Sequence, residues 1–146
     1  MSTQVSSITR VLYFRLDEFS SHDGVPYPQE WVQDRWLPLA LLLDRIREAW
    51  GGPLLVVSGY RSPARNEAVG GAKASQHVEG RAADIKPLNP DASDALWTMI
   101  KDMHFRGLLP RLGGLGRYPG KWVHVDIREG GRLAQWTGAG VGSEIA

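Results

Sequence analysis

Apolar residues recur at helical spacing in two long segments of this chain. From about residue 29 to residue 50 they predict a first helix, and the Gly-Gly-Pro sequence at residues 51–53 ends the pattern. The stretch NPDASDALWTMIKDMHF, residues 89–105, predicts a second helix with Asp91 and Ser93 as candidate caps. These are the two substantial helices that the sequence predicts.

Shorter patterns surround the first of these helices. VLYFRLDEF, residues 11–19, suits a short strand or an ordered arm, and LLVVSGY, residues 54–60, reads as a buried strand. Ser62 followed by Pro63 is typical of a helix start, and the helix must be short because Gly70 and its neighbouring glycine end it. A short helical unit is therefore expected in the middle of the chain.

Glycine-rich turns around alternating segments dominate residues 112–138, LGGLGRYPGKWVHVDIREGGRLAQWTG. This pattern is typical of an antiparallel hairpin region. Helices that come first and strands that come mainly afterwards indicate an α+β fold, with a small antiparallel sheet packed with helices. The length of 146 residues suits a single domain over residues 1–146.

The predicted strand KWVHVDI, residues 121–127, has two different faces because strand side chains alternate. The residues expected to face the core are Val123, Val125 and Ile127. The residues expected on the opposite face, as the floor of a cleft, are Trp122, His124 and Asp126. In GRAADI the same alternation groups Asp84 with Ala82, which is too small to block access to the carboxylate.

Charge and composition exclude several functions. Seventeen basic and sixteen acidic side chains give a formal net charge of +1, and no long run of either sign is present, which argues against a nucleic-acid partner. No stretch approaches membrane-spanning length, so membrane insertion is not expected. Because the chain has no cysteine, any metal must be held by nitrogen and oxygen ligands.

His77, Asp84 and His124 form one set of such ligands. A catalytic zinc site has three protein ligands of these types and keeps a fourth position for water or substrate. Gly80 would let the chain turn between the first two residues, and an aspartate ligand offsets part of the charge of the dication. On spacing alone, the two histidines are equally well explained as ordinary polar residues and Asp84 as a turn or salt-bridge carboxylate.

Two longer stretches carry a resemblance to a known family. SGYRSPARNEAVGGAKASQHVEGRAADI and the later GGLGRYPGKWVHVDIR resemble the M15 peptidases, which are zinc-dependent D-Ala-D-Ala carboxypeptidases and murein peptidases with a hedgehog-like fold. The resemblance covers residues from about Pro53 to Trp136. It implies that His77, Asp84 and His124 bind Zn²⁺.

The resemblance also implies roles for two further residues. Arg61 would be the cation near the substrate carbonyl or carboxylate, and Asp126 would be the general base that takes the proton of the attacking water. Many relatives carry their base three residues before the last histidine, where this chain has Lys121. The base role therefore falls on Asp126, two residues after His124 on the same face of the strand.

Substrate contacts are expected from Ser75, Tyr60 and Trp122. Ser75 lies two residues before His77 and would bind the substrate backbone or cap its own loop. Aromatic side chains more often serve the core, and Trp122 is the one for which a recognition role is favoured. His22 and the histidine at position 104 lie outside the motifs and are interpreted as structural or solvent-exposed.

The sequence thus predicts a zinc metallopeptidase that acts, as a monomer, on peptide bonds of peptidoglycan stems or cross-links. Carboxypeptidase and endopeptidase action both stay open, and a noncatalytic zinc-stabilised wall-binding module or a phage structural module is the alternative. The N-terminal stretch lacks the pattern of a signal peptide, so synthesis in the cytoplasm is expected. Phage-type release or delivery in a virion would then bring the enzyme to the wall, and recycling of cytoplasmic muropeptides fits as well.

Overall fold

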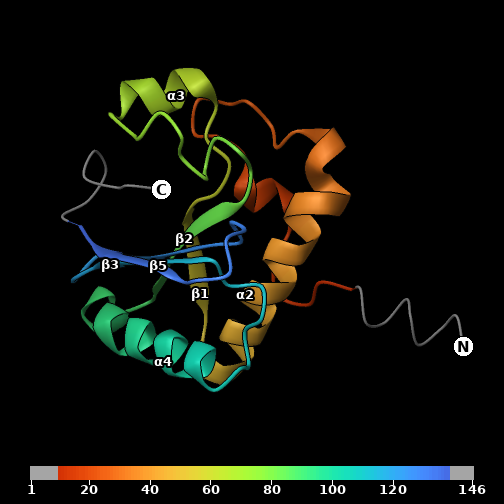
Figure 1. Cartoon of the computed structure of the whole chain (residues 1–146). Helices are drawn as coiled ribbons and strands as arrows, with labels where there is room; N and C mark the ends of the chain where they lie inside the picture. Colours follow the sequence, from red (N-terminus) through yellow and green to blue (C-terminus); the bar gives the residue numbers. More distant parts are fainter. Residues whose placement is uncertain (1–9, 139–146) are drawn as a thin grey trace, which may run out of the picture.

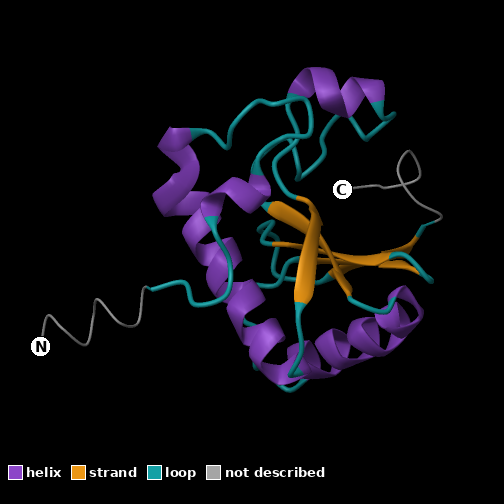
Figure 2. Ribbon diagram, turned by 180° about the vertical axis from the view of Figure 1, so that it is seen from behind, coloured by secondary structure: helices purple, strands orange, loops and turns teal. Residues whose placement is uncertain are grey.

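Five strands form one mixed sheet at the centre of the computed structural model, which describes residues 10–138 (Figures 1 and 2). Their order is β1-β2-β4-β3-β5. The strands are β1 Leu54–Ser58, β2 Ala82–Pro87, β3 Gly114–Tyr118, β4 Trp122–Asp126 and β5 Ala134–Thr137. With the helices packed against this sheet, the predicted α+β class is confirmed. The ends of the predicted domain, residues 1–9 and 139–146, lie outside the described residues.

Within residues 10–138 three α-helices accompany the sheet: α2 Leu37–Trp50, α3 Pro63–Ala68 and α4 Ser93–Phe105. In Figure 1, α4 lies on one side of the sheet and α3 on the other. Between α4, α2 and the sheet lies the core, in which the most completely buried side chains include Leu39, Leu43, Ile46, Ile85, Leu96, Ile100, Val123 and Val125. The predicted core face of β4 is therefore confirmed, and its opposite face points toward the side of α3.

The two long helices begin differently from their prediction. A 3₁₀ turn, Gln29–Trp31, and a π-helical turn, Val32–Trp36, precede the regular part of α2. Before α4 a 3₁₀ turn, Pro90–Ala92, is capped by the side chain of Asn89, which accepts a hydrogen bond from the backbone of Asp91. Neither Asp91 nor Ser93 is the cap, because the hydroxyl of Ser93 donates instead to the carbonyl of Lys121.

Other predicted boundaries hold. Gly51 ends α2 in the left-handed region at a φ of 79°, where glycine has no steric penalty. Ser62 caps α3 by accepting a hydrogen bond from the backbone of Arg65 at 3.1 Å. The arm over residues 11–19 contains a 3₁₀ turn, Leu16–Phe19, and is the ordered arm of the two predicted forms. Its backbone is tied to α2 by the Asp44 carboxylate, which accepts hydrogen bonds from residues 12 and 13.

Two predictions about the sheet are wrong in part. β1 is an edge strand and not a buried one, and its Leu55 is 44% exposed. β5 pairs with β3 in parallel, whereas the other pairs are antiparallel as predicted. After β4 the chain crosses to the far side of β3, where it forms β5. The strands β4 and β5 therefore do not form a hairpin.

Candidate active site

The register of β2 against β4 brings two predicted ligands face to face. Asp84 pairs with His124 and Ala82 pairs with Asp126, so all four side chains share one face of the sheet. The Oδ1 atom of Asp84 lies 3.0 Å from Nδ1 of His124. The prediction that Asp84 and His124 face one space from two strands is therefore confirmed.

His77 reaches the same point from the loop before β2. Its ring Nδ1 lies 2.7 Å from the carbonyl oxygen of Gly59, and its own carbonyl accepts a hydrogen bond from the backbone of Arg61 at 3.1 Å. The hydroxyl of Ser75 accepts from the backbone nitrogen of His77. With the ring held in this way, Nε2 of His77 lies 3.2 Å from Oδ1 of Asp84.

Hydrogen-bond partners determine which nitrogen of each ring carries the proton. The Gly59 carbonyl can only accept, so Nδ1 of His77 donates to it, and in the neutral ring Nε2 keeps its lone pair. The carboxylate of Asp126 accepts from Nε2 of His124 at 2.7 Å, which leaves the lone pair of that ring on Nδ1. Both of these lone pairs thus face the same carboxylate oxygen of Asp84, an arrangement that a cation between the three atoms would satisfy.

These residues fit a zinc ion. The three ligand atoms of His77, Asp84 and His124 lie within 4.8 Å of one another. Tetrahedral ligands at about 2.0–2.1 Å from zinc are roughly 3.3 Å apart, close to the 3.2 Å and 3.0 Å that separate the Asp84 oxygen from the two nitrogens. All three side chains are buried, and burying a carboxylate and two rings together is costly without a charge to compensate them.

Asp126 lies behind His124, on the opposite side of the ring from Asp84. Arg128 holds it with two side-chain hydrogen bonds, from Nη2 at 2.6 Å and from Nε at 2.9 Å, and its backbone adds a third. Burial alone would raise the pKa of Asp126, but the hydrogen bonds from Arg128 and His124 outweigh it and lower that pKa. Asp126 is therefore an ionised carboxylate that orients His124, as carboxylates commonly do for metal-binding histidines.

This position does not suit the predicted role of Asp126 as general base. Its side chain is 0% exposed, and both of its oxygens already accept hydrogen bonds. A general base must reach the proton that it removes, whereas the ring of His124 stands between Asp126 and the ligand atoms. The prediction that Asp126 and His124 share one face of the strand was correct. On that face, however, Asp126 lies beyond His124, on the side of the ring away from the ligand atoms.

Two glycines allow the backbone to approach the buried polar side chains of the site closely. A Cβ atom on Gly114 of β3 would lie 2.2 Å from Oδ2 of Asp126, so only glycine fits there. A Cβ on Gly71 would lie 2.6 Å from Nη1 of Arg61 and even closer to the side chain of Asn66. These two glycines leave the space that the buried polar groups occupy.

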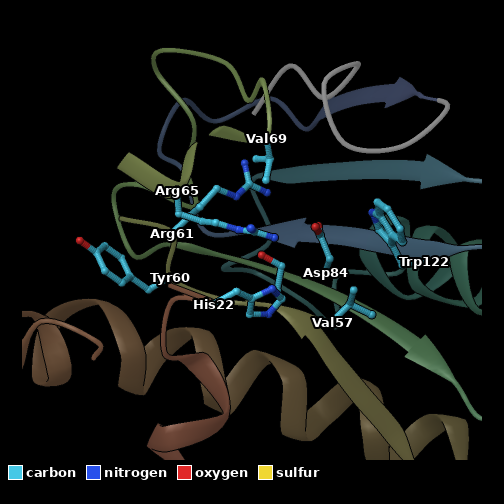
Figure 3. A pocket seen from close by; sticks show the side chains of 9 residues that line it. His22, Val57, Tyr60, Arg61, Arg65, Val69, Asp84 and Trp122 are labelled. Atoms are coloured by element: carbon cyan, nitrogen blue, oxygen red, sulfur yellow. The ribbon is translucent and has the colours of Figure 1, made fainter. Parts of the chain in front are cut away.

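Arg61 lies at the edge of the site, 3% exposed. Its Nη1 donates a hydrogen bond to the side-chain oxygen of Asn66 at 2.8 Å, and the Asn66 amide donates in turn to the Ala72 carbonyl at 2.9 Å. Both contacts hold the guanidinium in place. Figure 3 shows it pointing toward Asp84, which agrees with the predicted place of this cation beside the reacting group.

A cleft of about 220 Å³ opens above Asp84 (Figure 3). Its lining residues are His22, Val57, Ser58, Tyr60, Arg61, Arg65, Val69, Asp84 and Trp122. Of the three predicted substrate contacts, Trp122 and Tyr60 line this cleft. In Figure 3 the Tyr60 ring points away from Asp84, and it packs edge-on against the rings of Tyr27 and Trp31. Trp122 is thus the aromatic side chain best placed to meet a substrate.

Ser75 takes the capping role that the sequence left open. Its side chain is 0% exposed and its hydroxyl accepts from the backbone of His77. This capping contact is the one that the structure shows, and the substrate contact of Ser75 stays a prediction.

Three residues that the structure brings to the site were given no functional role from the sequence. Arg128 continues the alternation of His124 and Asp126 by two more residues, and this period would have placed it on the same face. Asn66 lies one helical turn after Ser62, within the quoted motif. His22 comes from a turn far away in the sequence, and no local pattern could indicate its position in the cleft.

An α+β fold with a buried His-Asp-His set at the floor of a cleft, and an arginine beside it, is an arrangement that suits a metal-dependent hydrolase. The family model of Peptidase M15 matches residues 15–126 of the chain. The chain therefore belongs to the M15 peptidase family, whose members are metallopeptidases, as its motifs predicted. A search of curated proteins finds no match.

Proposed function

We propose that this M15 peptidase is a zinc enzyme that hydrolyses peptide bonds in the stem peptides or cross-links of bacterial peptidoglycan. The observation that carries the proposal is the convergence of two imidazole lone pairs on one oxygen of Asp84, with the other nitrogen of each ring already committed as a donor. His77, Asp84 and His124 would hold the ion. The donor set of two nitrogens and one oxygen is typical of catalytic zinc.

The surrounding residues supply the rest of the reaction. Zinc bound by these three residues would supply Lewis-acid chemistry, which would favour attack of water on the scissile carbonyl near neutral pH. Arg61 faces the same space with a guanidinium held by Asn66. It stabilises negative charge that develops on the carbonyl oxygen, or it binds a substrate carboxylate, and both tasks suit its fixed fork of donors.

The wall substrate rests on the family, since M15 peptidases include D-Ala-D-Ala carboxypeptidases and murein peptidases. The cleft walls decide where a peptide chain ends, so removal of a terminal D-Ala and cleavage within a stem are both open to this site. Trp122 would pack against an apolar part of the peptide. Among the described residues, no helix is long and apolar enough to cross a membrane.

Purified protein and isolated peptidoglycan test the proposal directly. The sacculi are incubated with zinc-loaded protein, with protein treated with a chelator, and with the His77→Ala variant, and the released fragments are identified by mass spectrometry. We expect stem-peptide fragments or free D-Ala from the first sample alone. Their masses identify the bond. Equal release after chelation, or no release from zinc-loaded protein, would contradict the proposal, and zinc binding without release would favour the wall-binding module.

A further inference from the structure

Hydrolysis of a peptide bond needs a group that takes a proton from the attacking water and delivers one to the departing amine. The residue predicted for this task, Asp126, lies behind His124 and is occupied by Arg128. Lys121, at the position where many relatives carry the base, is not among the residues that line the cleft. The proton-transfer group therefore has to come from another wall of the cleft.

The titratable groups that line the cleft in the described part of the chain are His22, Tyr60, Arg61, Arg65 and Asp84. Arginine keeps its proton throughout the working range of an enzyme. Burial raises the pKa of the Tyr60 phenol, and its ring points away from Asp84. Asp84 belongs to the ligand set. His22 is left, and the imidazole of histidine is the side chain that most often transfers protons in general acid–base catalysis.

The turn that carries His22 is fastened to the motif beside the ligands. Its two neighbours both bind Ser62: the hydroxyl of Ser21 accepts from the Ser62 backbone at 3.1 Å, and the carboxylate of Asp23 accepts from the Ser62 hydroxyl at 2.5 Å. Just before this turn, the carbonyl of Phe19 accepts a backbone hydrogen bond from Tyr60 at 2.9 Å. The residues on both sides of His22 are thus fastened to Ser62, the residue that follows Arg61.

The imidazole is also accessible, because His22 is an exposed residue. In Figure 3, Asp84 lies between Arg61 and His22 on one side and Trp122 on the other. A peptide that lies across Asp84 would therefore meet the imidazole and the guanidinium together. This is the position that a proton-transfer residue needs, near the ligand set and open to substrate.

We propose that His22 is the proton-transfer residue of this active site, an inference that rests on the proposed peptidase function. The neutral imidazole takes a proton as the water oxygen bonds to the carbonyl carbon. The resulting imidazolium then gives that proton to the amine nitrogen as the carbon–nitrogen bond breaks, so His22 ends as it began. The charged groups around it are Arg61, Arg65 and Asp84 in the cleft and Asp23 on its own turn.

The test compares His22→Gln and His22→Ala with His104→Gln, which removes a histidine on α4, outside this cleft. Activity is measured on a D-Ala-D-Ala-terminated tripeptide, or on a soluble stem peptide with the bond that the sacculi experiment identifies. We expect both His22 variants to keep their zinc while kcat falls roughly 100-fold or more and KM changes little. Free imidazole should restore part of the activity of His22→Ala. His104→Gln should match the unmodified protein.

A second measurement does not depend on turnover. In NMR spectra of the zinc-loaded protein, the imidazole resonance that is missing in His22→Gln should shift when the peptide is added, and the His104 resonance should not. Near-normal kcat in His22→Gln, a rise in KM alone, or an unperturbed His22 resonance would overturn the assignment of His22. If the unmodified zinc protein hydrolysed neither sacculi nor peptide, the proposed function itself would fall.

Discussion

The Nε2 atom of His124 lies 2.7 Å from Oδ2 of Asp126, and neither side chain is exposed to solvent. This contact orients the ring so that its other nitrogen faces Asp84. A carboxylate in this position also makes the imidazole a better ligand. The metal affinity of the site should therefore depend on a residue that does not bind the metal.

Asp126→Asn tests this dependence. The amide can still accept a hydrogen bond from the ring, but it no longer balances the charge of Arg128. We expect the zinc dissociation constant to rise roughly 10- to 100-fold, as measured by competition with a chromogenic chelator. Asp94→Asn is the matched control, since it breaks a more exposed aspartate–arginine pair with Arg117 and should leave zinc affinity unchanged. Unchanged affinity in Asp126→Asn with a 100-fold loss of kcat would restore the base role to Asp126.

Gly114→Ala reaches the same carboxylate from the neighbouring strand. Its new Cβ would stand 2.2 Å from Oδ2 of Asp126, so Asp126 must move and its contact with His124 must weaken. We expect the free energy of unfolding to fall by about 1–3 kcal/mol, together with a loss of zinc affinity. Chemical denaturation and the chelator competition measure the two effects.

Gly52→Ala is the control for this substitution, because its nearest neighbours, atoms of the Trp50 ring, would be 3.9 Å away. Its stability should stay within about 0.5 kcal/mol of the unmodified protein. If Gly114→Ala behaved in the same way as this control, the tight fit around Asp126 would not hold in solution.

Local pattern was enough to predict much of this site. The alternation along β4 placed His124 and Asp126 on one face, and the same rule placed Asp84 on the cleft face of β2. The role of Asp126 could not be predicted in the same way. Alternation gives the face on which a side chain lies, but it does not say how far along the strand that side chain lies from the metal-binding atoms. Whether Asp126 lies before or behind His124 depends on the ring orientation, which the contacts of that ring with Asp84 and with the carboxylate held by Arg128 determine only after folding.

The parallel strand β5 and the turn of His22 show a second limit. Each is positioned by contacts between segments far apart in the chain: β5 by its register with β3, and the turn by its hydrogen bonds to Ser62. Hairpin rules describe neighbouring strands and carry no information on such pairings. For the same reason His22, about sixty residues before Asp84, was interpreted from the sequence as structural or exposed.

On acidification, we expect the protein to lose its zinc first and its fold at a lower pH. Protons compete with zinc for the imidazoles of His77 and His124, so zinc should leave as the pH falls. The lowered pKa of Asp126 acts later. A carboxyl group with a lowered native pKa contributes stability above its unfolded value of about 3.9 and loses it as the pH falls through the native value.

We therefore expect bound zinc, measured by elemental analysis after equilibrium dialysis, to fall at a higher pH than the circular dichroism signal of the metal-free protein. The metal-free fold should persist down to about pH 4. Loss of zinc and of the fold in a single step near pH 6 would show that the metal, and not the Asp126–Arg128 pair, holds this part of the sheet together.

The hold of Asn66 on Arg61 gives the last prediction. Asn66→Ala removes the oxygen that accepts from Nη1 at 2.8 Å, while the ligands of the metal keep their own contacts. The guanidinium should lose its fixed position, so kcat/KM on the peptide substrate should fall roughly 10-fold, the equivalent of about 1.4 kcal/mol, with zinc affinity unchanged. Because Asn66 acts through Arg61, the same substitution should cost nothing further once Arg61→Ala is in place. An equal additional loss in the double variant would mean that Asn66 contributes to the reaction by a route of its own.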